Sequence, residues 1–179
     1  MKEKIDVTEI YVRYYETDRM KIVHHSNYFR YFELARCNFF IKKIVPYSVL
    51  EEKYGILSPL LSASAQFFKP LKFEDVFKII TFISSFNLTR VTFEYICIFC
   101  KNPNPNSQSI CGDKKIEIEE CIDIVQKFLN VGQKLSGLIC VGKTEHTFVD
   151  SKSFKPIRPR VFIEEKGEEL DNIINRLRL

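Results

Sequence analysis

The chain has 179 residues, of which 45% are hydrophobic and 28% charged, a balance typical of a globular protein with a sizeable core. Its formal net charge is only +4, which is too small and too dispersed to indicate a nucleic-acid-binding protein. No stretch has the length and hydrophobicity of a membrane span, and residues 1–6 lack the apolar run of a secretion signal. We therefore expect a cytoplasmic protein whose six cysteines are reduced thiols.

The first two predicted elements are a strand and a buried helix. Residues 5–15 alternate with apolar groups on both sides, which predicts a strand covered on both faces. From Ser26 or Asn27, both good N-cap residues, apolar side chains recur at spacings of three and four, which predicts a helix. The apolar surface of this helix is wide enough to indicate deep burial, and Pro46 is expected to end or kink it.

Most of the remaining chain is predicted to form strands. A short helix is expected near residues 48–54, and residues 56–68 then alternate in polarity as a strand does. Later strands rich in Val, Ile, Phe and Thr are predicted at about 75–84, 89–100 and 138–149, with a hairpin connection at 85–88. One early helix followed by strands indicates an α+β fold, with an antiparallel sheet wrapped around a single long helix.

Two segments depart from this pattern. Residues 102–136 begin with a run rich in Pro and Asn that cannot continue a strand, and residues 118–129 then show helical spacing. We interpret this segment as an insertion rather than a second domain, because it is too short to bury its own core. From about residue 164, apolar residues in helical register predict a C-terminal helical tail. Residues 1–179 are thus predicted to form one domain.

Polar side chains are concentrated in residues 16–33. Asp18, His24 and His25 lie between the end of the first strand and the start of the helix, where free backbone N–H groups and the helix dipole favour negative charge. A carboxylate at this place could attack a carbonyl or activate a water molecule, while the helix-end amides stabilise the oxyanion. The alternative is that Asp18 only caps a turn and that the histidines are surface polar groups.

Other catalytic signatures are absent or weak. The sequence has no Gly-x-Ser-x-Gly motif, and its six glycines are too scattered for a phosphate-binding loop or a dinucleotide fingerprint. Cys97 and Cys100 have the spacing of zinc ligands, but residues three apart in a strand point to opposite faces, which favours buried thiols. We interpret His146 as a hydrogen-bonded structural residue and Glu33 as a helix-face partner of a neighbouring arginine.

The run Val12–Arg36, with Glu16-Thr17-Asp18 and His24-His25-Ser26-Asn27-Tyr28, resembles the 4-hydroxybenzoyl-CoA thioesterase family. It is most similar to the branch of bacterial acyl-CoA thioesterases associated with the Tol-Pal system. The resemblance continues through residues 55–70 and 142–150. It implies a hotdog fold that hydrolyses an acyl-CoA thioester to free acid and CoA. It implies no metal or redox cofactor, and a site between two subunits of a homodimer or homotetramer.

The resemblance also implies individual roles. Asp18 matches the catalytic aspartate of the family, as nucleophile or general base, and His25 matches a histidine that assists positioning or proton transfer. The backbone amide of His24 would polarise the thioester carbonyl, and Tyr28 would face the site from the first helical turn. Lys21 stands where the family usually has glycine, so we expect a loop of different shape or charge.

Two other functions remain open at this point. One is a different hotdog enzyme, which acts on acyl-carrier-protein thioesters or hydrates an enoyl thioester. The other is a hotdog module that binds acyl-CoA without hydrolysing it. Asp18 favours hydrolysis, and the sequence carries no DNA-binding segment that would indicate a regulator. Six basic residues are candidates for contacts with the CoA phosphates: Lys69, Lys72, Arg90, Lys155, Arg158 and Arg160.

Overall fold

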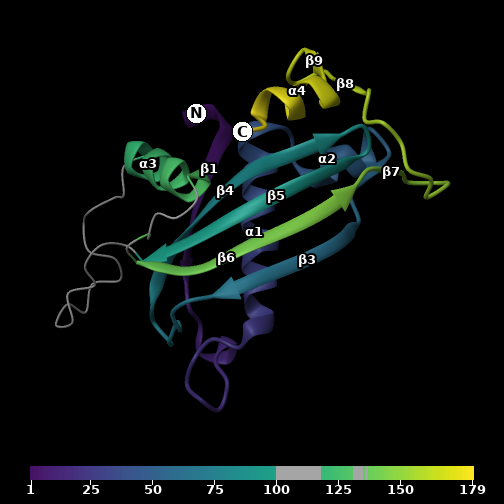
Figure 1. The fold of residues 1–179 in the computed structure, drawn as a ribbon. Helices are drawn as coiled ribbons and strands as arrows, with labels where there is room; N and C mark the ends of the chain where they lie inside the picture. The colour runs from purple at the N-terminus through teal and green to yellow at the C-terminus, as the bar shows by residue number, and fades with distance from the viewer. Residues whose placement is uncertain (100–117, 131–134, 136) are drawn as a thin grey trace.

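A computed structural model describes residues 1–99, 118–130, 135 and 137–179 of the chain (Figure 1). Its centre is an antiparallel sheet whose five strands neighbour one another in the order β1 (Ile5–Tyr11), β4 (Val76–Asn87), β5 (Arg90–Phe99), β6 (Leu138–Thr147) and β3 (Leu60–Phe67). Helix α1 (His25–Lys43) crosses one face of this sheet. The predicted arrangement of one long helix on an antiparallel sheet is therefore confirmed.

Shorter elements complete the described fold: η1 (Lys2–Lys4), η2 (Tyr14–Glu16), α2 (Tyr47–Glu52), β2 (Ile56–Leu57), α3 (Ile118–Leu129), β7 (Val149–Asp150), β8 (Phe162–Ile163), β9 (Glu168–Glu169) and α4 (Leu170–Leu177). Strand β2 pairs with β7, and β8 pairs with β9, each in an antiparallel ribbon. Helix α4 is the predicted tail helix, and its apolar side chains are buried in the main core. No helix in these ranges is both long and apolar enough to cross a membrane.

The two faces of the sheet are covered by different helices. Side chains alternate along β4, so that Phe77 and Ile79 pack in the cluster around α1 while Ile80 and Phe82 belong to a second cluster. This second cluster contains buried residues of α3, which therefore packs on the sheet. Helix α3 confirms the helical spacing predicted within the insertion. Residues 102–117 of the insertion lie outside the described residues.

Gly142 in β6 lies directly against α1. A Cβ at this position would overlap the ring of Phe32, which itself stacks on Tyr95 with ring centroids 4.5 Å apart. We expect Gly142→Ala to lower the free energy of unfolding by about 1–3 kcal/mol, the usual cost of overpacking a core, as measured by urea denaturation. The same substitution should cost less in a Phe32→Leu background. An equal cost in both backgrounds would contradict this explanation.

Two predicted boundaries near the N-terminus are wrong. Strand β1 ends at Tyr11 and a 3₁₀ turn follows at Tyr14–Glu16, so the predicted strand over 5–15 is too long. Helix α1 begins at His25 rather than after Ser26 or Asn27, because His24 is its N-cap and the His24 ring accepts the Ser26 N–H. The helix start is therefore earlier than the apolar spacing indicates.

Two predicted connections also differ. The hairpin turn between β4 and β5 consists of residues 88–89 rather than 85–88, because β4 continues to Asn87 and Leu88 takes up the positive φ of the turn. The predicted strand over 56–68 is divided into β2 and β3, and the interruption contains Pro59, which cannot donate to a ladder. Pro46 precedes α2 as its N-cap, in agreement with the predicted end of α1.

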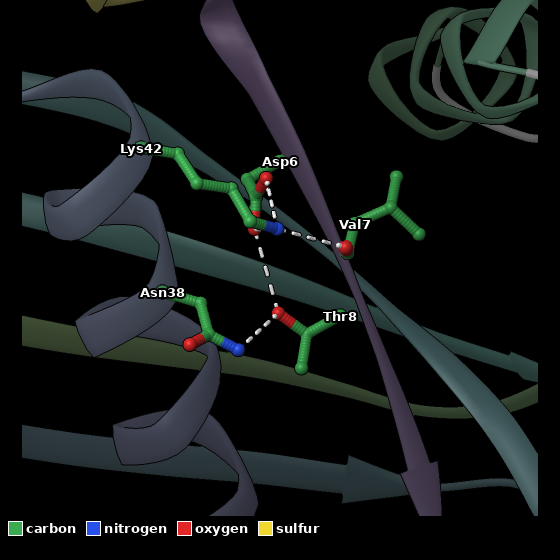
Figure 2. Close-up of polar contacts among 5 residues, drawn as sticks. All are labelled: Asp6, Val7, Thr8, Asn38 and Lys42. Atoms are coloured by element: carbon green, nitrogen blue, oxygen red, sulfur yellow. Dashed lines mark hydrogen bonds and ion pairs between the residues drawn. The ribbon is translucent and has the colours of Figure 1, made fainter.

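Polar contacts join α1 to β1, which forms one edge of the sheet (Figure 2). The ammonium of Lys42 lies 2.9 and 3.0 Å from the two carboxylate oxygens of the buried Asp6, and 3.4 Å from the carbonyl oxygen of Val7. Asn38 Nδ2 donates to Thr8 Oγ1 at 3.2 Å. Charged groups along an edge strand discourage pairing with another strand, so this edge is protected.

Candidate active site

A cavity of about 350 Å³ opens beside the start of α1. Its wall is formed by the loop between η2 and α1, the first turn of α1, and the end of β3 with the residues that follow it: Asp18, Met20, Ile22, Val23, His25, Tyr28, Phe67, Phe68, Lys69 and Pro70. Three of the four predicted site residues, Asp18, His25 and Tyr28, therefore line one cavity. Most of the other wall residues are apolar, so the cavity places a carboxylate and a histidine beside space for an apolar group.

Asp18 is held in a tight turn by its own backbone and side chain. Its Oδ1 accepts the N–H of Met20 at 2.7 Å, its N–H donates to the carbonyl of Ile22 at 2.8 Å, and its carbonyl accepts the N–H of Lys21 at 2.9 Å. Within the described part of the chain, Oδ2 accepts no hydrogen bond. Asp18 thus does cap a turn, and one carboxylate oxygen remains available at the cavity.

Lys21 adopts a backbone conformation that favours glycine. Its φ is +62°, in the left-handed region, where a Cβ is normally strained. The loop therefore has the shape that glycine would favour, although the residue is a lysine. This backbone conformation does not support the expectation of a different loop shape. The difference between Lys21 and a glycine is therefore the exposed ammonium group.

We expect Lys21→Gly to raise the free energy of unfolding by about 0.5–1 kcal/mol. Relief of the left-handed strain, about 1–2 kcal/mol, exceeds the entropic cost of a glycine in the unfolded chain. Urea denaturation measures this difference. Lys72→Gly is a matched control, because Lys72 is also exposed but has a negative φ, and it should not stabilise the protein. A destabilised Lys21→Gly variant would rule out backbone strain at this position.

His24 does not have the predicted role. Its backbone N–H donates to the carbonyl of Glu16 at 2.9 Å, so this amide is not free to polarise a substrate. Its ring lies 2.8 Å from Ser26 Oγ and does not line the cavity. The N–H of His25, the first residue of α1, has no acceptor among the residues that the structure describes. Because His25 lines the cavity, its amide replaces that of His24 as the candidate donor.

Tyr28 forms the inner wall of the cavity. Its ring meets that of Phe67 edge to face, with centroids 4.9 Å apart, and the residue is buried. Burial raises the pKa of the Tyr28 phenol, with a smaller contribution from the nearby Cys140 thiol, so the hydroxyl stays protonated at neutral pH. Tyr28 therefore presents a neutral aromatic surface with a polar end to the cavity.

Apart from Lys69, a candidate for the CoA phosphates, the wall formed by residues 67–70 was not predicted as part of the site. These residues lie within the resemblance, but their alternation indicated only a strand. Of the basic candidates for CoA phosphates, Lys69 lies in this wall. Arg90 is 3.2 Å from a Glu145 oxygen, and Arg158 is 3.0 Å from a buried oxygen of Asp171, so both are already paired. The structure therefore favours Lys69 among the candidates.

His146 and Cys97 are not among the residues that line the cavity. Burial, with a smaller effect of Arg36, lowers the pKa of His146 to about 4, and its ring nitrogens contact Ser58 O at 3.3 Å and Thr144 Oγ1 at 3.1 Å. It is thus the structural histidine that was predicted. Cys97 is a buried free thiol in the core, whereas Cys100 and Cys111 lie outside the described residues.

Comparison with known proteins identifies the class. A family model described as the thioesterase-like superfamily matches residues 12–166. The chain belongs to this superfamily, a class of hotdog-fold thioester hydrolases. The predicted hotdog fold is thereby confirmed.

Individual relatives agree with this class. A protein of Aquifex aeolicus (strain VF5), provisionally named an esterase, is 45% identical over 85 residues, which are 48% of this chain and 66% of that protein, just under two thirds of its length. A provisionally named acyl-CoA thioesterase of Bacillus subtilis (strain 168) is 34% identical over 113 residues, 60% of this chain and 79% of the relative. The solved DHNA-CoA thioesterase from Staphylococcus aureus superposes with a TM-score of 0.68 at 23% identity, covering 97% of this chain and 90% of that one.

Proposed function

We propose that this chain hydrolyses acyl-CoA thioesters to a free acid and CoA, with Asp18 as nucleophile or general base. The observation that carries the proposal is the position of Asp18 and His25 in one cavity at the N-terminus of α1. A thioester carbonyl in this cavity would lie near the Asp18 carboxylate and near the His25 N–H at the start of α1. The apolar wall would accept the acyl group, and Lys69 would attract the phosphates of CoA.

Two reaction courses are compatible with this geometry. In the first, Asp18 takes a proton from water, the hydroxide adds to the carbonyl carbon, and the intermediate expels the CoA thiolate, which takes up that proton. In the second, an Asp18 oxygen adds to the carbonyl, the thiolate leaves, and water hydrolyses the resulting anhydride. In both courses the negative carbonyl oxygen is stabilised by the His25 N–H and the α1 dipole. The His25 ring would assist proton transfer, and its presence in the cavity wall supports this role.

A hydrolysis screen tests this function. Purified protein is mixed with short-chain, long-chain and aromatic acyl-CoAs and with an acyl-carrier-protein thioester, and free thiol release is followed. We expect turnover of at least one acyl-CoA class. Release only from the carrier protein would favour the other hotdog enzyme. Binding of acyl-CoA without release would favour the non-hydrolytic module.

The finer family position belongs to the same proposal. The resemblance of residues 12–36 supports the Tol-Pal-associated branch. The free thiols of Cys37, Cys97, Cys121 and Cys140 support a cytoplasmic location.

We also propose that two copies of the chain associate through β3. This strand forms the sheet edge opposite β1, and its sequence contains no charged residue and no proline. Leu60, Leu61 and Phe67 are 55%, 47% and 46% exposed. A long, uncharged and apolar edge strand is prone to pair with another strand, whereas β1 carries the protecting contacts of Lys42.

This edge is continuous with the candidate active site. Phe67 is the last residue of β3, and Phe67 and Phe68 both line the cavity. A second copy paired along β3 would therefore lie beside the cavity wall and contribute to it. This agrees with the shared site that the family resemblance implies. A homodimer, or a homotetramer built from such dimers, is thus part of the proposed function.

A further inference from the structure

Glu16 connects the loop that carries Asp18 to helix α1. Its carboxylate Oε2 accepts the N–H of Arg13 at 2.7 Å and the hydroxyl of Tyr31 at 2.8 Å. Its carbonyl oxygen accepts the N–H of His24 at 2.9 Å and the side-chain amide of Asn27 at 2.7 Å. One residue therefore joins the end of the first strand, the N-cap of α1 and the second turn of α1.

The side chain of Glu16 is a carboxylate buried in the protein interior, where charged groups are uncommon. The residue is only 6% exposed, and within the described residues its carboxylate forms no ion pair. Burial of a carboxylate without a cation is unfavourable unless hydrogen bonds compensate it. Burial and the hydrogen bond to Glu16 both raise the pKa of Tyr31, so its hydroxyl remains a donor. The hydrogen bonds from Arg13 and Tyr31 are thus the compensation for the burial of this carboxylate.

The Glu16–Tyr31 pair lies at the beginning of the loop that carries Asp18. Asp18 follows Glu16 by two residues, and its loop closes where Thr17 and Val23 form an antiparallel bridge. The N–H of Val23 also donates to the carbonyl of Leu71 at 2.8 Å, next to the cavity wall. Glu16 fixes the near end of this loop to the same helix whose first residue supplies the candidate oxyanion donor.

We propose that Glu16, held by Tyr31, is a positioning residue that sets the Asp18 carboxylate relative to the N-terminus of α1. The inference rests on the proposed function for its catalytic consequence, but the loop geometry can be measured without catalysis. A displacement of a reacting group by about 1 Å can reduce a rate by roughly 100-fold. Loss of the Glu16 contacts should therefore lower kcat while leaving the binding of substrate almost unchanged.

Three variants isolate this role. Glu16→Leu removes the acceptor, and we expect kcat to fall by ~100-fold. Tyr31→Phe removes one donor, and we expect a fall of ~10-fold. Glu16→Gln is the conservative variant: both side-chain bonds go to the same oxygen, which an amide oxygen can replace. Its kcat should stay within about threefold of the natural protein, because the loop contacts are retained.

Tyr95→Phe is a matched control for Tyr31→Phe. Tyr95 is also buried, and its hydroxyl also forms a 2.8 Å hydrogen bond, to Thr144 Oγ1, but its polar partners, Thr144 and Arg36, lie outside the loop. Both variants lose one buried hydroxyl and should lose similar thermal stability. Only Tyr31→Phe should lower kcat, with an unchanged Kd for a non-hydrolysable thioether analogue of acyl-CoA.

Hydrogen exchange of the backbone amides in residues 17–23 provides a readout that does not depend on activity. Glu16→Leu and Tyr31→Phe should accelerate exchange at Asp18 and Val23, whereas Tyr95→Phe and Glu16→Gln should not. If the natural protein hydrolyses no acyl-CoA, the proposed function fails, and these exchange rates still decide the positioning role. Equal effects of Tyr31→Phe and Tyr95→Phe on loop exchange would overturn it. A Glu16→Gln variant as impaired as Glu16→Leu would do the same.

Discussion

Asp18→Asn is expected to lower kcat for acyl-CoA hydrolysis by at least ~100-fold, the scale of losing a catalytic acid–base group. Asparagine has nearly the same shape as aspartate, and its Oδ1 can still accept the Met20 N–H that holds the loop. Its amide can neither attack the carbonyl nor accept a proton from water. Free thiol release at saturating acyl-CoA measures the effect.

A control separates catalysis from a general loss of charge. Asp123→Asn also removes one carboxylate. Asp123 lies at an exposed position of α3 and does not line the cavity. This substitution should leave kcat unchanged. The KM of Asp18→Asn should change little, because the carboxylate is expected to act in the transition state rather than in binding. Unimpaired turnover by Asp18→Asn would refute the assignment of Asp18.

The second large effect is expected at the β3 edge. Ser62→Lys together with Ser64→Lys places two ammonium groups on exposed positions of the same strand, where a symmetric partner would bring the same charges close together. We expect the dimer to dissociate to the 21.1 kDa chain and activity to fall with it. Light scattering at micromolar concentration reports the mass, and thiol release reports the activity.

Two lysines at other exposed positions provide the comparison. Asn87→Lys with Gln126→Lys adds the same charge away from β3 and should keep both dimer and activity. If the natural protein is itself a 21.1 kDa monomer and still hydrolyses acyl-CoA, the shared site is excluded. A β3 variant that remains a dimer would place the interface elsewhere.

Elements with strong periodicity could be predicted from the sequence alone. The apolar spacing of three and four in α1 indicated a helix because one face of it packs on the sheet, and α4 followed the same rule. The strand character of β4 was predicted from its Val, Ile and Phe content, whereas α3 as the cover of its second face was not predicted. Such patterns are visible in the sequence because each buried position is occupied by an apolar side chain.

Features set by backbone hydrogen bonds were harder to predict. The start of α1 depends on the His24 ring as a cap and on the His24 N–H contact with Glu16, and neither leaves a signal in hydrophobic spacing. Asp18, His25 and Tyr28 were predicted as site residues because the family resemblance of residues 12–36 implies roles for them. Phe67 and Phe68 were not identified, because they reach the cavity only through the tertiary fold, and Lys69 was only one of six basic candidates.

Single-turnover kinetics test the central claim most directly, because they separate the chemical step from binding and product release. Excess enzyme is mixed with acyl-CoA, and the CoA released in one turnover is measured for the natural protein and for Asp18→Asn. The proposed mechanism predicts that both proteins form the complex and that release from Asp18→Asn is at least ~100-fold slower. Equal single-turnover rates would show that the Asp18 carboxylate does not drive hydrolysis.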